Sequence, residues 1–392
     1  MDNLIAANLK QRPMRTLLSV VGVALGVILV VLTGGLARGM MRDSAQRQAN
    51  VDAEIRFFPP GSFSTAANPL KLRTAYADAI LHGVKPAPED SDVEPKPPVG
   101  GVVAASPVGE WVQPTLGGIG FEVIDGIDYP SFCQTTPLRL VEGRAPADSG
   151  TDDGPYEAII DRYYSEHNGP SDGQQVKVGS TIPVFGRQFT VVGIYEPSVL
   201  GRVKIPLATM QRFMGGADNC TFIMVRTEKP EMAGQVVANI QEYYPGNNIV
   251  LTRDLPALYS QGIRPLEVFL DVVIGLAVVI STLVIFLAMY TTIIERTREI
   301  GILKSLGASK GFIVMVIEKE AALISAFGVV FGFILSVIGK YGIEARTRLI
   351  IDLHPRWLLM AAIIGVAGGI IGALYPAFRA ATLDPIEAIS YE

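Results

Sequence analysis

The chain has 392 residues, 49% of them hydrophobic and only 18% charged, with a formal net charge of −5. The charges are uneven, because residues 38–271 hold 20 Lys or Arg against 28 Asp or Glu, whereas the rest of the chain holds 13 against 10. An acidic central segment of this size argues against nucleic acid as its partner, and it is long enough to bury a core of its own.

Four runs without a charged residue are long enough to cross a bilayer. They are Thr16–Ala37, Val272–Ile294, Ala321–Gly339 and Trp357–Phe378. About 20 apolar residues in a helix span the hydrocarbon core, and in lipid the backbone groups find partners only inside such a helix. Core helices of soluble proteins rarely run this far without a charge, so we predict membrane helices in a 1+3 arrangement. Their expected bounds are 16–37, 266–294, 311–339 and 357–378.

The segment before the first run, residues 1–15, places Leu4, Ile5 and Leu9 on one helical face. This spacing predicts a short amphipathic helix on the inner membrane surface, although a frayed terminus fits equally well. The first run is longer than the apolar region of a signal peptide, and no Ala-x-Ala site follows it. We therefore expect this run to be a retained helix.

An even number of spans places both termini on one side of the membrane. Basic residues before the first run and after the second favour the cytoplasm for those segments: Lys10, Arg12, Arg15, Arg296, Arg298, Lys304 and Lys310. The bias is weak, because basic residues also follow the first and third runs. It predicts an extracytoplasmic domain at 38–265 and an extracytoplasmic loop at 340–356, with cytoplasmic segments at 295–310 and 379–392.

The long insert alternates strand and helix patterns. Helix is expected to continue outward over Met40–Ala53. Strands are expected at Phe121–Ile127, Leu138–Leu140 and Thr221–Arg226, a hairpin at Lys177–Ile182 and Gln188–Ile194, and helices at Ala208–Met214 and Met232–Tyr243. Residues 83–101, which are rich in Pro and acidic residues, and Ala147–Pro155 are expected to be exposed loops. The predicted fold class is an α-helical membrane protein with four transmembrane helices and an α+β extracytoplasmic domain.

Catalytic and metal sites are poorly supported by the sequence. His82, His167 and His354 are far apart, and the chain has no H-E-x-x-H, no G-x-S-x-G and no phosphate-binding G-x-x-x-x-G-K-[ST]. We therefore expect no catalytic residue, no metal and no cofactor on this chain. Cys133 and Cys220 both lie in the insert, where they fit either a disulfide or two ordinary thiols.

Residues 295–309, between the second and third spans, combine charge, apolar spacing and helix breakers. The segment opens with four charged residues: Glu295, Arg296, Arg298 and Glu299. An apolar stripe follows: Ile302, Leu303 and Leu306. Gly301 permits a change of direction before the stripe, Gly307 suits the end of a helix, and Ser309 can cap the next one. Such a stripe can be buried against headgroups and other helix ends, or in a groove of a cytoplasmic partner, and both interpretations remain open.

The carboxyl-terminal segment, residues 375–389, has a similar character. Asp384 at the N-cap, Pro385 at the first helical position and Glu387 two residues later form a capping-box variant that opens a small cytoplasmic helix.

Small residues three or four positions apart occur in several spans and let helices approach closely. Gly328/Gly332 and Gly365/Gly369/Gly372 are expected to pack spans within one subunit, and Gly22/Gly26 is our candidate for a subunit interface. We also expect the acidic residues of 318–320 to pair with the basic turn at 295–309.

Three blocks of the chain resemble the permeases of the MacB and FtsX superfamily of ABC transporters: residues 8–19, 295–309 and 376–387. Shorter motifs in the insert resemble the MacB-type extracytoplasmic domain: Gly126–Pro130, Glu142–Arg144, Val178–Gly179 and Val191–Tyr195. The Pro-rich loop near residue 90 departs from the usual pattern.

The resemblance implies that residues 295–310 are a coupling helix. This helix would dock on a separate ABC ATPase subunit, which would hold ATP and Mg. The residues that the resemblance assigns to ATPase coupling are Glu295, Arg296, Arg298, Glu299, Ile300, Gly301, Leu303, Lys304, Leu306 and Gly307. It assigns a C-terminal cytoplasmic motif to Pro376, Arg379, Asp384, Pro385 and Glu387.

The resemblance also implies a bacterial cytoplasmic membrane, a dimer with a second copy or a paralogue, and a periplasmic membrane-fusion adaptor. By mechanotransmission such a permease would export an amphipathic substrate, such as a lipid, lipoprotein, peptide or antibiotic, from the periplasm or outer leaflet. The alternative is an FtsX-like relay, which transports nothing and activates an extracytoplasmic hydrolase.

Overall fold

The computed structural model describes residues 13–61, 70–84, 96–114, 121–148, 155–167, 175–255, 264–345 and 349–384. The chain divides into two compact units. The helical unit comprises Met1–Met40, Ile263–Glu344 and Ile350–Glu392, and the sheet unit comprises Met41–Gly262 and Ala345–Leu349.

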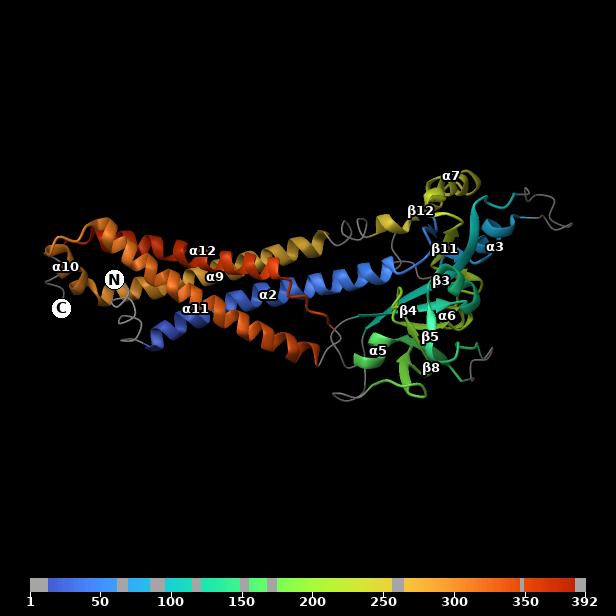
Figure 1. Cartoon of the computed structure of the whole chain (residues 1–392), viewed down its shortest axis with the longest axis horizontal. Helices are drawn as coiled ribbons and strands as arrows, with labels where there is room; N and C mark the ends of the chain where they lie inside the picture. Colours follow the sequence, from blue (N-terminus) through green and yellow to red (C-terminus); the bar gives the residue numbers. More distant parts are fainter. Residues whose placement is uncertain are drawn as a thin grey trace. The chain divides into compact units, whose positions relative to one another are not determined.

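In the described part of the helical unit there are four long helices: α2 (Pro13–Ala49), α9 (Arg264–Glu295), α11 (Lys310–Glu344) and α12 (Pro355–Thr382). All four are long and apolar enough to cross a membrane. The short helix α10 (Thr297–Ser305) lies between α9 and α11 (Figure 1). As predicted, helix α2 continues beyond the first apolar run, and it ends at Ala49.

Glycines set the close approach of the four helices. A side chain on Gly328 or Gly332 of α11 would meet Val23 or Val27 of α2. Likewise, a Cβ at Gly26 of α2 would lie 1.9 Å from the Ser281 hydroxyl oxygen of α9. The prediction that Gly22/Gly26 forms a subunit interface is therefore wrong, because α9 of the same chain occupies that face of α2.

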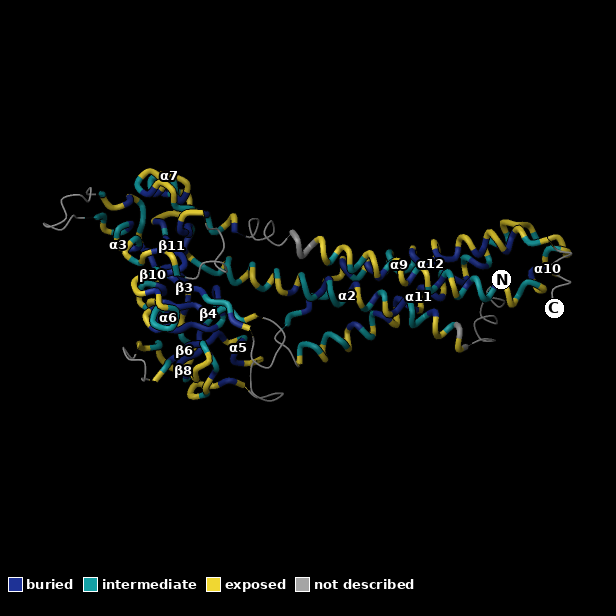
Figure 2. The backbone as a smooth tube through the Cα atoms, turned by 180° about the vertical axis from the view of Figure 1, so that it is seen from behind, coloured by how far each residue is buried: buried dark blue, intermediate teal, exposed yellow. Residues whose placement is uncertain are grey.

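The outward faces of the spans are apolar as well. Leu276, Leu283 and Leu287 of α9 are all more than half exposed, and exposed and buried residues alternate along each helix (Figure 2). Helices that are apolar on both their inner and their outer faces are typical of a membrane bundle, since lipid covers the outer faces.

The segment that leads into α12 lies against α2. The Asp352 N–H donates to the Gly35 carbonyl oxygen at 2.9 Å, and a Cβ at Gly39 would lie 1.9 Å from the Ile350 carbonyl oxygen. The Arg38 guanidinium lies 3.9 Å from the ring centroid of Trp357. Small residues on α2 therefore make room for this segment.

The described strands of the sheet unit form one mixed sheet of ten, in the order β12-β1-β11-β3-β4-β9-β6-β8-β5 with β7 paired to β8. Its strands are β1 (Ile55–Phe58), β3 (Val102–Pro114), β4 (Phe121–Ile127), β5 (Arg139–Gly143), β6 (Glu157–Asp161), β7 (Thr181–Val184), β8 (Arg187–Glu196), β9 (Val203–Pro206), β11 (Phe222–Thr227) and β12 (Asn248–Leu251). Two short strands, β2 (Leu72–Arg73) and β10 (Asn219–Cys220), pair separately.

Short helices cover the sheet: α3 (Ala75–His82), α4 (Tyr129–Thr135), α5 (Arg162–His167), α6 (Leu207–Met214) and α7 (Ala233–Tyr243), with single turns η1 (Pro230–Met232) and η2 (Thr252–Asp254). Successive side chains of β11 point to opposite faces of the sheet, and Phe222 and Met224 pack in a core that α4 also lines. Ile223 and Val225 face the opposite core, which α3 and α7 close. A third core lies among β6, β8, β9 and α6.

The parallel pairing of β4 with β9 joins the two halves of the sheet, with Ile124 opposite Val203. The predicted fold class is confirmed, because the described residues form four long apolar helices and a mixed α/β domain. The strand at Phe121–Ile127 has the predicted bounds. The predicted hairpin forms as the antiparallel pair β7–β8, but its first strand is Thr181–Val184 and not Lys177–Ile182.

Parts of two predicted loops fall outside the described residues, namely 85–95 and 149–154. The flanks of the first are packed, contrary to prediction: Val99 is buried, and its N–H donates to the Ile80 carbonyl oxygen at 3.0 Å. Neither cysteine forms a disulfide. Cys220 is buried and Cys133 is half-buried, and they contact different cores.

Candidate functional site

The candidate site is the end of the helical unit that carries α10. We call it the α10 end, and it comprises α10 with the adjoining ends of α9, α11 and α12. The chain turns at Arg296, whose φ of −107° and ψ of 13° lie outside the helical range. The prediction that Gly301 makes the turn is wrong, because Gly301 lies in the middle of α10 and is buried.

Helix α10 ends and the next helix begins as the sequence predicts. Gly307 follows α10 with a φ of +94°, which is a conformation that glycine adopts without strain. The Ser309 hydroxyl then accepts the N–H of Phe312 at 3.2 Å and caps α11.

The two sides of α10 differ sharply in exposure. Ile300 and Gly301 are buried, whereas Ile302 and Leu303 are each 45% exposed and Leu306 is 80% exposed. Among the residues that the structure describes, nothing therefore covers the predicted apolar stripe. The charged side chains of Arg298 and Glu299 are exposed on the same helix.

Two basic side chains fix α10 to the neighbouring helices. The Arg296 guanidinium, only 12% exposed, lies 3.7 Å from the Glu320 carboxylate of α11, as predicted. The predicted pairing of Glu318 is wrong, because both of its carboxylate oxygens are buried without a hydrogen-bond partner among the described residues. Lys304 donates to the carbonyl oxygen of Ala381 at 2.9 Å and also to that of Leu383. Lys304 therefore binds the last carbonyl groups of α12, where a cation also complements the helix dipole.

A small apolar core lies beneath α10. It consists of Ile293, Ile300, Ile313, Ile317, Ala377, Ala380 and Ala381. The core joins α9, α10, α11 and α12, so the α10 end is a packed cap and not a free loop. It also brings together the two predicted site segments, 295–309 and 376–384, which are far apart in sequence.

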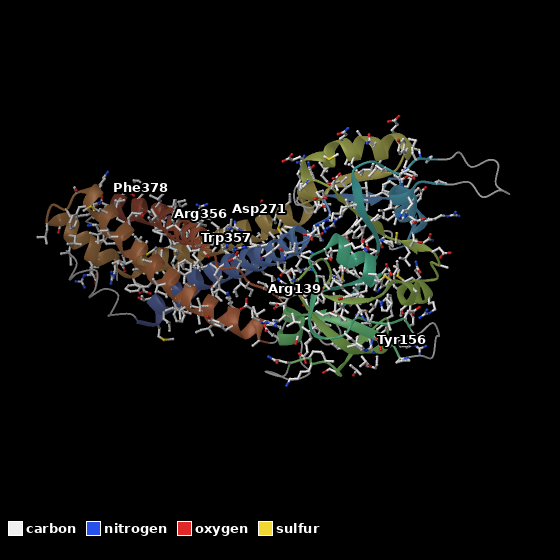
Figure 3. The ribbon with its side chains drawn as sticks, turned by 45° about the vertical axis from the view of Figure 1, so that its right-hand side comes forward. Arg139, Tyr156, Asp271, Arg356, Trp357 and Phe378 are labelled. Atoms are coloured by element: carbon white, nitrogen blue, oxygen red, sulfur yellow. The ribbon has the colours of Figure 1, made fainter. Side chains whose placement is uncertain are left out.

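The predicted C-terminal motif is only partly described. Pro376 is buried inside α12. The guanidinium of the exposed Arg379 lies 5.7 Å from the ring centroid of Tyr290. Figure 3 labels the preceding residue, Phe378, at this end of α12. Asp384 is the last described residue, so the capping box with Pro385 and Glu387 lies outside the described residues.

Each histidine has a local role. His82 contacts Asp78 at 2.8 Å, His167 contacts the Tyr163 carbonyl oxygen at 2.9 Å, and the His354 ring accepts the Arg356 N–H at the start of α12. Within the described ranges, no group of three or more His, Cys, Asp or Glu side chains could hold a metal ion.

Two domain families match almost the whole chain. The family described as "MacB-like periplasmic core domain" matches residues 16–243, and the family described as "FtsX-like permease C-terminal" matches residues 272–385. The chain belongs to the MacB-like ABC transporter permeases. It is thus a membrane protein with an extracytoplasmic domain, in a family whose permeases generally work with an ATPase subunit.

Some relatives have about the length of this chain, and others are considerably longer. The "uncharacterized ABC transporter permease MJ1507" of Methanocaldococcus jannaschii is 23% identical, over 98% of this chain and 96% of its own length. The "uncharacterized ABC transporter permease YknZ" of Bacillus subtilis is 22% identical, over 97% and 96%. The "macrolide export ATP-binding/permease protein MacB" of Campylobacter jejuni is 21% identical over 97% of this chain, which spans only 59% of that protein.

Solved structures of extracytoplasmic regions also match. The extracellular domain of YknZ covers 50% of this chain with 14% identity and a TM-score of 0.33. The periplasmic region of MacB from Actinobacillus actinomycetemcomitans covers 54% with 13% identity and a TM-score of 0.35.

Proposed function

We propose that this chain is the permease subunit of a mechanotransmission ABC transporter, and that a separate ATPase subunit docks on α10. The observation that carries the proposal is the exposed stripe of Ile302, Leu303 and Leu306 on a short helix that is itself firmly held. An amphipathic helix with two or three apolar anchors fits a hydrophobic groove on a partner protein. ATP and Mg belong to that partner.

The roles of the ten coupling residues divide by exposure. Arg298, Glu299 and the stripe contact the ATPase subunit, together with the exposed Glu295. Arg296, Ile300, Gly301 and Lys304 face the helical unit and hold α10 in place, while Gly307 ends the helix. In this arrangement a movement of the docked subunit displaces α10 together with the ends of α9, α11 and α12.

We place the α10 end and both termini in the cytoplasm of a bacterium, with the sheet unit outside the cytoplasmic membrane. The support is the excess of basic residues before the first span and in 295–310. A dimer with a second copy or a paralogue is part of the proposal, because an ATPase dimer offers two docking grooves and four spans are too few to enclose a path.

The proposed substrate is amphipathic, such as a lipid, lipoprotein, peptide or antibiotic, and it is taken from the periplasm or outer leaflet with a membrane-fusion adaptor. Relatives named for macrolide export, which align with nearly all of this chain, support this class. An FtsX-like relay to an extracytoplasmic hydrolase is the second candidate, because the carboxyl-terminal half matches the FtsX-like family. The MacB-like match over 16–243 favours export.

Affinity purification of the tagged full chain in mild detergent tests the docking site. We expect the wild type to recover a nucleotide-binding subunit, and Leu303→Asp or Glu299→Lys to lose it. Val141→Asp is the matched control, because Val141 is 47% exposed on β5, against 45% for Leu303, but lies in the sheet unit. Recovery that is indifferent to both α10 variants would remove the coupling assignment.

A further inference from the structure

The last turns of α2 belong to the sheet unit, where they bind the segment between β8 and β9. The Asn50 side-chain amide donates to the Ser198 carbonyl oxygen at 2.9 Å. The Arg47 guanidinium donates to the Leu200 carbonyl oxygen, and the Leu200 N–H donates back to the Arg47 carbonyl oxygen at 3.3 Å. We call residues 198–202 the β8–β9 segment.

Arg202, at the end of the β8–β9 segment, bridges α2 and β6. Its guanidinium lies 2.6 Å from the Asp43 carboxylate of α2 and 2.7 Å from the Asp161 carboxylate of β6. It also lies 4.0 Å from the ring centroid of Tyr163. Asp43 receives a second bond from the Arg47 Nε at 3.0 Å, so two cations and two carboxylates form one network.

The network is shielded from water. The Arg202 side chain is 16% exposed and that of Asp161 is fully buried. Burial lowers the pKa of Arg202, but the carboxylates of Asp161 and Asp43 raise it above its ordinary value, so the guanidinium stays charged. Charge-assisted bonds in such surroundings are stronger and more directional than exposed ion pairs.

The β8–β9 segment is also fixed to the middle of the sheet. The Gly201 N–H donates to the Asp125 carboxylate of β4 at 2.8 Å, and the Tyr195 hydroxyl of β8 donates to the Gly201 carbonyl oxygen at 2.9 Å. The fully buried Lys204 ammonium lies 2.7 Å from the same Asp125 carboxylate. The segment is therefore a rigid link and not a flexible loop.

Besides the bonds of Arg47 and Asn50 to the β8–β9 segment, two routes lead from α2 into the sheet. The covalent route runs from Ala49 to β1, which pairs with β11 and β12. The other route runs through the side chain of Asp43 and reaches β6 directly. Through the sheet alone, a displacement of α2 would pass from β1 to β6 across the pairings of β11, β3, β4 and β9. The bonds of Arg47 and Asn50 join α2 to the β8–β9 segment but do not contact β6.

We propose that Arg202 is a positioning residue that transmits movement of α2, through Asp43, to the part of the sheet formed by β6 and β8. The proposal rests on the proposed function, because it assumes that ATP hydrolysis moves α2. A planar guanidinium that binds two carboxylates at once transmits both push and pull, which a lysine ammonium does less well.

The test is hydrogen–deuterium exchange on the full chain purified with its nucleotide-binding subunit, with and without ATP. In the wild type we expect ATP to alter exchange in residues 41–49, in β1 and in β6. In Arg202→Gln we expect the change in 41–49 and β1 to persist, the change in β6 to be lost, and ATPase turnover to be retained. Arg212→Gln is the matched control, because Arg212 pairs with Asp148 in the same unit.

Further variants separate this role from a general loss of structure. Asp43→Asn leaves Arg202 paired with Asp161 and should reproduce the loss in β6, while Asp43→Asn combined with Arg202→Gln should be no worse than either alone. Arg202→Lys should restore part of the response. A wild-type response of β6 in Arg202→Gln overturns the proposal. A wild-type complex whose sheet unit never responds to ATP instead overturns the proposed function, and this proposal with it.

Discussion

At the α10 end, neighbouring residues on one short helix have opposite tasks. Lys304 points back and binds the last carbonyl groups of α12, whereas Leu303 beside it is 45% exposed. In the proposed docking, a helix that presents an apolar stripe to a partner needs a second set of contacts, because otherwise a force on the stripe would only bend the loop. Arg296 and Lys304 supply those contacts.

Within the sheet unit, a single ion pair predicts a pH response. Arg144 holds the pKa of Glu157 below its ordinary value of 4.5, chiefly through their hydrogen bonds, and the Ala147 N–H donates to the same carboxylate at 2.8 Å. Because the folded-state pKa is lowered, the stabilisation is present above 4.5 and is lost as the pH falls through the folded-state value.

Protection factors for amide exchange in peptides covering 144–148 should show this response. In the wild type we expect them to be constant from neutral pH to about pH 5 and to fall below pH 4.5. Glu157→Gln should lower them at neutral pH and remove the pH dependence. Glu142→Gln, an exposed change on the edge strand β5, should leave the wild-type profile. A Glu157→Gln profile that overlays the wild type would contradict the assignment.

At the scale of elements, the helical unit depends on glycines that let a neighbour approach. A Cβ at Gly39 of α2 would lie 1.9 Å from the Ile350 carbonyl oxygen, whereas a Cβ at Gly275 of α9 would meet nothing within 4 Å. Gly39→Ala should therefore destabilise the detergent-solubilised chain by about 1–3 kcal/mol, the usual cost of overpacking.

The matched change Gly275→Ala should have the opposite sign. Alanine in a helix interior is more stable than glycine by about 0.5–1 kcal/mol when space permits. The midpoint of thermal unfolding or aggregation of the two variants is the measurement. Equal midpoints, or a stabilised Gly39→Ala, would show that the segment before α12 does not rest on α2.

Most helices and strands could be predicted from the local pattern of apolar and polar residues, because that pattern determines which faces of each element are buried. Charge-free runs predict the four long helices, and period-two alternation predicts β4 and the β7–β8 hairpin. The pairing of Ile124 with Val203 could not be predicted, since 79 positions separate them and strand pattern says nothing about a distant partner. For the same reason, the bond from Lys304 to Ala381 could not be predicted from the sequence. The prediction that places Gly301 at the turn is wrong, because the burial of a residue on α10 depends on how the ends of the neighbouring helices pack.

At the scale of the whole molecule, the account requires α10 and the sheet unit to lie on opposite sides of a membrane. Helix α2 runs without a break from Pro13 to Ala49, past the boundary between the two units at Met40. In the proposed mechanism, the movement of a subunit docked at Leu303 and Leu306 would be passed through the helices to Asp43 and Arg202. The two domain families identify the family of the chain. The side of the membrane on which each unit lies is a separate property, which a labelling experiment measures.

Labelling of single cysteines in intact cells tests this requirement most directly. In a Cys133→Ser background, where the remaining Cys220 is buried, Glu166→Cys places an exposed thiol in the sheet unit and Ser305→Cys places one on α10. With a membrane-impermeant maleimide, we expect Glu166→Cys to react in intact cells once any outer membrane is opened, and Ser305→Cys to react only after the cytoplasmic membrane is permeabilised. Reaction of both from the same side would contradict the central claim.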